Sequence, residues 1–182
     1  PGGLSDVGGY GTAASDGVLA VGDGRAGVTL FDLANPANPA IGGTVDTVDA
    51  LTTVVKVGSI VYGCDGNQGI VAVDAGDPKA PVVLSEAIFD PPGNAAPDLA
   101  PAGGVMYVAT RFGLGVLDIH DPSALAWKGI VPLPQKAGVS SVRVVGTHVV
   151  ATSSFFDFEG TNNSATRLHV FDASDPLAPV LV

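Results

Sequence analysis

One ten-residue pattern occurs four times along the chain and constrains the fold more than any other feature. Each copy consists of an apolar run, an Asp, two residues, an Asn or Asp, and a Pro. The repeated Asp residues are Asp32, Asp74, Asp118 and Asp172, and they are separated by 42, 44 and 54 residues. Periods of roughly 40–50 residues, with several strands in each unit, are typical of propeller blades.

Each unit divides into four strand-like runs. In the second unit these runs cover 51–58, 59–64, 69–74 and 81–86, and turns rich in Asp, Gly and Pro separate them. We therefore predict an all-β fold, a β-propeller of four-stranded antiparallel blades, with about four blades in one region spanning 1–182. The predicted blades cover approximately 4–47, 48–90, 91–134 and 135–182.

Composition and charge support this fold and exclude several function classes. The chain has 25 Gly and 14 Pro among 182 residues, which argues against a helical bundle. A formal net charge of −10 disfavours binding to nucleic acid, because phosphate backbones would be repelled. No apolar stretch approaches the roughly 20 residues of a membrane span, so we expect no membrane insertion. Cys64 stands alone in an apolar run and is expected to be a buried small side chain.

The third strands resemble the LVIVD repeat family, which is named for an apolar strand that ends in Asp. Here these strands end in Leu-Phe-Asp, Val-Asp, Val-Leu-Asp and Val-Phe-Asp, and an Asx-Pro turn follows each. The resemblance covers nearly the whole chain as four tandem copies. It implies a β-propeller, commonly in bacterial or archaeal exported or surface proteins, and it implies no particular activity.

The repeated Asp residues are expected to form turns. Each Asp closes a strand just before a Pro turn, where its carboxylate can accept backbone N–H groups of the following residues. A ring of acidic ligands is the competing interpretation, and we favour the turn.

A central channel is the first place to look for a small ligand. Aligning the units on the Gly before the second strand places Gly11, Thr53, Asp98 and Ser141 at equivalent positions of the first strand. Lys56 and Arg143 lie further along the same strands. We name Thr53, Lys56, Asp98, Ser141 and Arg143 as candidate ligand-binding residues, although small polar residues also suit a wet channel wall.

No catalytic constellation and no cofactor motif is found in the sequence. The fourth unit carries an insertion in which Asp157, Glu159, Thr161 and Asn163 alternate oxygen ligands, as a calcium loop does. The match is poor because the Gly is misplaced and no closing Glu follows. Asp157, Glu159 and Asn163 are therefore weak candidates for a calcium site, and no other cofactor is expected.

The chain is expected to be an incomplete ring, because the last strand at 178–182 stops early and residue 1 enters directly at a first strand. Such an arc exposes an apolar blade face, which further blades of the same protein or other chains would cover. We therefore expect the chain to be a fragment of a larger propeller. A closed four-bladed ring, or two chains that complete one eight-bladed ring, are the alternatives.

Three functions are compatible with the sequence. The leading hypothesis is a non-enzymatic module for protein–protein interaction or assembly in a secreted or cell-surface prokaryotic protein, with homo-oligomers as one form of assembly. The alternatives are a hydrolase or lyase with its site at the central channel, and a calcium-stabilised adhesion module.

Overall fold

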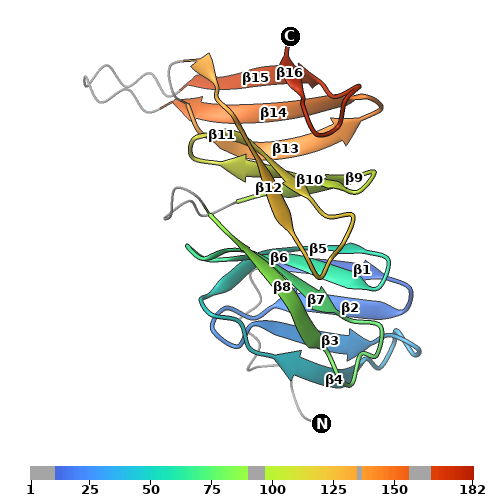
Figure 1. Ribbon diagram of the computed structural model, residues 1–182. Coiled ribbons are helices and arrows are strands. Elements are labelled where there is room, and N and C mark those ends of the chain that lie inside the picture. Colours follow the sequence, from blue (N-terminus) through green and yellow to red (C-terminus); the bar gives the residue numbers. More distant parts are fainter. Residues whose placement is uncertain (1–10, 90–96, 135–136, 156–164) are drawn as a thin grey trace. The chain divides into compact units, whose positions relative to one another are not determined.

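The described part of the chain is built entirely from short antiparallel strands. The computed structural model describes residues 11–89, 97–134, 137–155 and 165–182, and these form no α-helix. Sixteen strands form four sheets, and in every sheet the four strands follow one another in chain order (Figure 1). The all-β propeller fold with four-stranded blades is therefore confirmed.

We number the sheets as blades 1 to 4. Blade 1 contains β1 (Gly11–Ser15), β2 (Val18–Gly22), β3 (Val28–Asp32) and β4 (Ala40–Val45). Blade 2 contains β5 (Leu51–Val57), β6 (Ile60–Asp65), β7 (Gly69–Asp74) and β8 (Val82–Ile88). Blade 3 contains β9 (Leu99–Ala102), β10 (Val105–Thr110), β11 (Gly113–Asp118) and β12 (Ala126–Val131). Blade 4 contains β13 (Val139–Val145), β14 (His148–Phe155), β15 (Ala165–Asp172) and β16 (Val180–Leu181).

Tight hairpins connect the first two strands of the blades. Between β1 and β2 the turn residues Asp16 and Gly17 have φ of 53° and 73°. Two successive positive φ angles produce the turn twist that matches the right-handed twist of paired strands, and Asp-Gly supplies this at low cost. The sequence therefore specifies where the chain reverses.

The register makes the blades comparable position by position. The repeated Asp of each third strand pairs with the first residue of the second strand, in the pairs Asp32–Val18, Asp74–Ile60, Asp118–Val105 and Asp172–His148. Residues at the same distance before the repeated Asp are therefore structurally equivalent.

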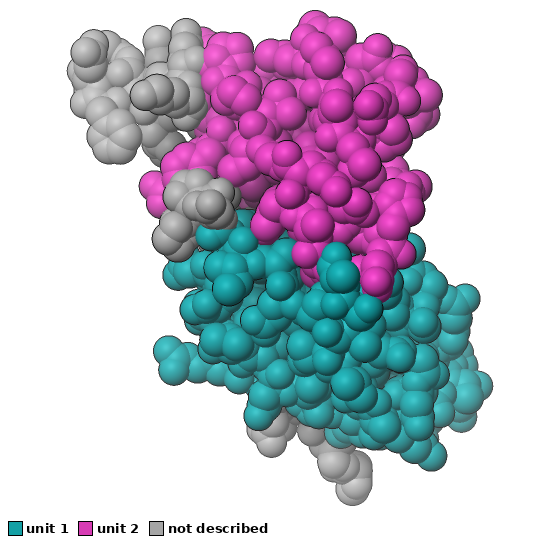
Figure 2. Space-filling view, viewed as in Figure 1, with its two compact units in different colours: residues 1–93, 122–124 teal, residues 94–121, 125–182 magenta. Residues whose placement is uncertain are grey.

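The chain forms two compact units, shown in two colours in Figure 2. Unit 1 comprises residues 1–93 and 122–124, and unit 2 comprises 94–121 and 125–182. In unit 1, side chains of blade 1 such as Leu30 pack with side chains of blade 2 such as Val73. In unit 2, Val116 of blade 3 packs with Phe171 of blade 4. Each unit therefore has an apolar core between two sheets.

Candidate functional site

The four repeated Asp residues each accept a backbone hydrogen bond from the residue two positions later. The distances from Oδ1 to that nitrogen are 2.8 Å for Asp32, 2.8 Å for Asp74, 3.1 Å for Asp118 and 2.9 Å for Asp172. The second Asx does the same in three blades, through Asn35, Asp77 and Asp175. These carboxylates therefore shape the Asx-Pro loops.

Asp118 has additional partners. His120 Nδ1 lies 2.8 Å from Asp118 Oδ1, and Lys128 Nζ lies 3.0 Å from Asp118 Oδ2. The hydrogen bonds from the His120 side chain and backbone, followed by the Lys128 ammonium, hold the pKa of Asp118 well below its usual range. Asp118 therefore remains charged under acidic conditions and connects its loop to β12.

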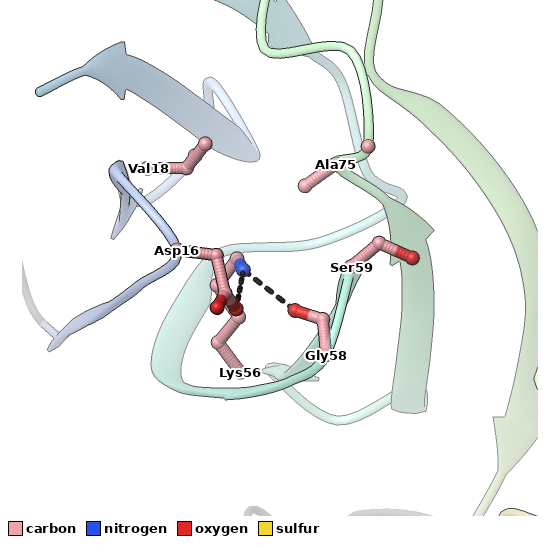
Figure 3. A pocket seen from close by; sticks show the side chains of 7 residues that line it. Asp16, Val18, Lys56, Gly58, Ser59 and Ala75 are labelled. Carbon is pink, nitrogen blue, oxygen red and sulfur yellow. Dashed lines mark hydrogen bonds and ion pairs between the residues drawn. The ribbon is translucent and has the colours of Figure 1, made fainter. Parts of the chain in front are cut away.

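Lys56 lies in a shallow pocket of unit 1, of about 350 Å³ (Figure 3). Its side chain is only 3% exposed, and its ammonium donates to Gly58 O at 2.6 Å and Ser15 Oγ at 3.0 Å. Asp16 Oδ2 lies 3.4 Å from the same nitrogen. The Ser15 hydroxyl and then Lys56 lower the pKa of Asp16. The Lys56 ammonium has three hydrogens and donates to three acceptors, so Lys56 links the β1–β2 turn to blade 2.

The structure brings Asp98, Ser141 and Arg143 together within unit 2. Asp98 Oδ2 accepts from Ser141 Oγ at 2.7 Å, from the Val142 backbone N–H at 2.9 Å and from Arg143 Nη1 at 2.5 Å. The other carboxylate oxygen accepts the Leu99 N–H at 3.1 Å. Donors of the protein therefore engage both oxygens, and the cluster joins the start of blade 3 to β13.

The alignment behind the channel prediction agrees with the strand register. Gly11 pairs with Gly22, Thr53 with Cys64, and Ser141 with Thr152, while the carbonyl of Asp98 accepts the N–H of Ala109. These partners occupy the same position of the second strand in all four blades. Thr53 and Lys56 belong to unit 1, and Asp98, Ser141 and Arg143 to unit 2. Ligand binding by these residues stays a prediction.

The weak calcium site at Asp157, Glu159 and Asn163 lies outside the described residues. Within the described ranges, no group of three or more His, Cys, Asp or Glu side chains could hold a metal ion. Across those same ranges, no helix is long and apolar enough to cross a membrane.

A buried carboxylate that sequence reasoning missed organises the connection between blades 1 and 2. Asp65 is 1% exposed and accepts from Thr47 Oγ1 at 2.8 Å and from the Val48 N–H at 2.9 Å. The Asp49 N–H lies 3.1 Å from both carboxylate oxygens. In the sequence, Asp65-Gly66 predicts only a hairpin turn, because the donors lie 16 to 18 residues away.

In blade 4, the buried Ser153 contacts the half-buried His169. Ser153 Oγ and His169 Nε2 are 2.8 Å apart, and burial, followed by the Arg167 charge, lowers the pKa of His169. A serine and a neutral histidine at this distance are chemically capable of nucleophilic catalysis. Ser153 is buried, however, so a substrate cannot reach its hydroxyl in this conformation.

The feature that stands out by burial is the outer face of blade 4, which we define by Leu168, Val170 and Val180. Leu168 is 67% exposed, whereas its equivalents in the other blades, Val28, Ile70 and Leu114, are all 0% exposed. Val170 is half-buried, while its equivalents Leu30, Ala72 and Val116 are buried. Val180 is exposed as well, and Val145 and Val182 add further exposed apolar surface. The side chains of blade 4 are therefore exposed or half-buried at two positions where the other three blades have buried side chains.

Comparison with solved structures identifies the class of protein. The computationally designed protein Ika4 is 12% identical, with a TM-score of 0.64 and a coverage of 92% of both chains. Sqt1 from Saccharomyces cerevisiae is 9% identical, with a TM-score of 0.63, and the match covers 92% of this chain and 45% of Sqt1. Designed Ika8 is 14% identical, with a TM-score of 0.63, over 90% of this chain and 45% of its own. These similarities show the β-propeller fold.

Two segments of the chain are similar to a known repeat. The model of the LVIVD repeat matches residues 13–47 and 93–132, which contain the third strands of blades 1 and 3. These two segments are therefore similar to the LVIVD repeat, and the described strands within them belong to four-stranded propeller blades. No curated protein matched the chain in a sequence comparison. The chain spans less than half the length of Sqt1 and Ika8.

Proposed function

We propose that the chain is a non-enzymatic propeller module for protein association and assembly, and that it acts through the outer face of blade 4. The observation that carries this proposal is Leu168, a large apolar side chain 67% exposed at a position that is fully buried in the other three blades. Contiguous exposed apolar surface is typical of interaction sites. The partner that fits is a further four-stranded blade with an apolar face, since that is what covers the equivalent face within each unit.

Two further considerations support a role in association. The N-terminal domain of Nup159 is a similar structure at 9% identity and a TM-score of 0.59, and a second similar structure contains Dbp5 bound to Nup159. The LVIVD resemblance implies an exported or surface protein, so we place the module in a secreted or cell-surface prokaryotic protein. That environment would expose the module to protein partners outside the cell.

The solution mass of the purified chain tests the proposal. Light scattering from micromolar to millimolar concentration should show association beyond 18.0 kDa, and Leu168→Asp should abolish it. Ile88→Asp is the matched control, because Ile88 is also a strand residue and is 62% exposed, but it lies on blade 2. Wild-type chain that stays at 18.0 kDa at every concentration would contradict the proposed function.

A further inference from the structure

Lys56 of unit 1 occupies a position where unit 2 has an apolar residue. Lys56 corresponds to Val144 of blade 4, because both pair with the second residue of the strand that follows. Ser15, which accepts a hydrogen bond from Lys56, corresponds to Ala102 of blade 3, because both pair with the first residue of the second strand. Val144 and Ala102 pack against the apolar core of unit 2. The junction between two blades can therefore be built from apolar side chains alone.

Packing between the blades does not explain the lysine. Its side chain is 3% exposed, so its ammonium has lost most of its contact with water, which costs free energy. Apolar residues in place of a buried ion pair are often neutral or stabilising, and unit 2 has the apolar version. The paired carboxylate of Asp16 is 75% exposed and adds little to the core. A role for the charge is therefore expected in the pocket that Lys56 lines.

This pocket combines a cationic end with an apolar wall. Figure 3 shows the Lys56 ammonium between the Asp16 carboxylate and the Gly58 carbonyl, while Val18 and Ala75 line the same pocket. Its volume of about 350 Å³ falls within the range of small-molecule sites, roughly 300–1,000 Å³. All of its lining residues belong to unit 1, so the pocket is complete within that unit.

Asp16 shows which chemical group the cationic end accepts. Its Oδ2 receives the Ser15 hydroxyl at 2.9 Å and lies 3.4 Å from Lys56 Nζ. The second distance is longer than the roughly 2.7–2.9 Å of a strong charge-assisted hydrogen bond. Because the Asp16 side chain is mostly exposed and lies on a turn, a ligand carboxylate can take its place.

We infer that this pocket binds a small aliphatic carboxylate. The anionic group replaces that of Asp16 beside Lys56 and Ser15, and the alkyl chain lies against Val18 and Ala75. A carboxylate is favoured over a phosphate, because the net charge of −10 opposes a dianion more strongly and one ammonium with one hydroxyl offers few donors. This site goes beyond association through blade 4 and does not depend on it.

Sodium butyrate is the probe, and two-dimensional NMR of the backbone amides is the measurement. At constant ionic strength, butyrate should shift the amide signals of Gly58 and Gly76 saturably in the millimolar range, the affinity expected for so small a ligand. The amides of Gly146 and Ser174, at the equivalent positions of unit 2, should not shift. Butyramide, which has a similar shape and no charge, should shift neither pair.

Two variants separate a binding site from a structural lysine. Lys56→Met removes the charge and should abolish the shifts. Asp16→Asn removes the competing carboxylate from an exposed turn, so this variant should fold, and butyrate should bind about two- to fivefold more tightly, the contribution of one exposed ion pair. Asp46→Asn is the matched control, because it changes the net charge equally and Asp46 does not line the pocket.

The absence of a saturable shift with butyrate, or equal shifts with butyramide, would overturn the inference. Equal shifts at the amides of unit 2 would overturn it as well. So would an Asp16→Asn variant that binds butyrate no more tightly than Asp46→Asn does, because Asp16 would then not compete with the ligand. If Lys56→Met does not fold, the comparison of Asp16→Asn with Asp46→Asn decides.

Discussion

Asp65 shows how one residue fixes the connection between two blades. Its buried carboxylate receives the hydroxyl of Thr47 and the N–H groups of Val48 and Asp49, which lie between β4 and β5. These donors would otherwise need water, and a buried donor without a partner is costly. Asp65 therefore acts as a fixed acceptor for a segment that has no strand of its own.

Replacing Asp65 should destabilise the chain substantially. Asp65→Ala removes a charged acceptor from several donors, and we expect a loss of about 3 kcal/mol or more in the free energy of unfolding. Asp65→Asn keeps one acceptor oxygen and should lose less. Urea unfolding followed by circular dichroism measures both. Equal losses in the free energy of unfolding for Asp65→Ala and Asp65→Asn would contradict the role of Asp65 as a hydrogen-bond acceptor.

Asp118 should make stability depend on acid pH. Its hydrogen bonds with His120 and Lys128 lower its pKa in the folded state below the value of about 4 expected for an unfolded chain. The stabilisation is therefore fully present above about pH 4 and is lost as the pH falls through the folded pKa. Asp118→Asn should lower the thermal midpoint at about pH 5.5 and have a smaller effect at about pH 3.

The exposed residue Asp46 provides the control for this pH dependence. Asp46→Asn should leave the midpoint nearly unchanged at both pH values. A deficit for Asp118→Asn that is the same at both pH values would show that the loss does not come from the charge of Asp118.

At the residue scale, the sequence predicts local contacts well and distant ones poorly. The Asx turns of Asp32 and Asp172 depend on residues two positions away, so the motif alone predicts them. Asp65 and Lys56 depend on partners up to 41 residues away, and their local patterns indicate only a hairpin and a strand. Asp98 and Ser141 could be named together from the sequence, because the repeat places them at equivalent positions of the first strand, and the structure shows a hydrogen bond between them.

At the scale of elements, the outer strand of blade 1 depends on two glycines. A Cβ at Gly42 would overlap the carbonyl oxygen of Pro78, and a Cβ at Gly43 would lie 2.5 Å from Pro81 Cδ. The N–H of Gly43 also donates to Pro78. The close approach of β4 to the Asx-Pro loop of blade 2 therefore requires residues without side chains at these two positions.

Gly42→Ala should accordingly force β4 and the loop apart. We expect a loss of about 1–3 kcal/mol in the free energy of unfolding, the usual range for an overpacked contact. Gly58→Ala is a useful comparison, because its Cβ meets no atom within 4 Å and its cost comes only from a φ of 57°. If Gly42→Ala loses a similar free energy of unfolding but leaves the amide exchange of β4 unchanged, the loss does not come from the close contact between β4 and the loop.

Strands and blades were predictable because apolar runs, turns rich in Asp, Gly and Pro, and the Asx-Pro pattern recur in each unit. The tight contact at Gly42 was not predictable, since an isolated Gly-Gly within a strand gives no indication of which loop approaches it. The exposure of Leu168 needs the structure too, because its sequence context matches that of the buried Leu114.

At the scale of the whole molecule, the net charge opposes association between copies, whereas the exposed apolar surface favours it. Each copy carries a formal net charge of −10, so two copies repel at long range, while the proposed contact through Leu168 is apolar. Added salt shortens the range of the repulsion and leaves apolar burial in place.

Association should therefore strengthen with ionic strength. Sedimentation equilibrium should show a larger associated fraction in about 0.5 M sodium chloride than in low salt. Leu168→Asp should remain a monomer under both conditions. Weaker association at high salt would indicate that ion pairs, rather than the apolar face, hold the copies together.

Hydroxyl-radical footprinting of Leu168 tests most directly whether the outer face of blade 4 is a protein-docking face. As the protein concentration rises, oxidation of Leu168 should fall, while Ile88, which is similarly exposed, should keep its rate. Equal oxidation of Leu168 at all concentrations, with a constant mass of 18.0 kDa, would contradict the claim.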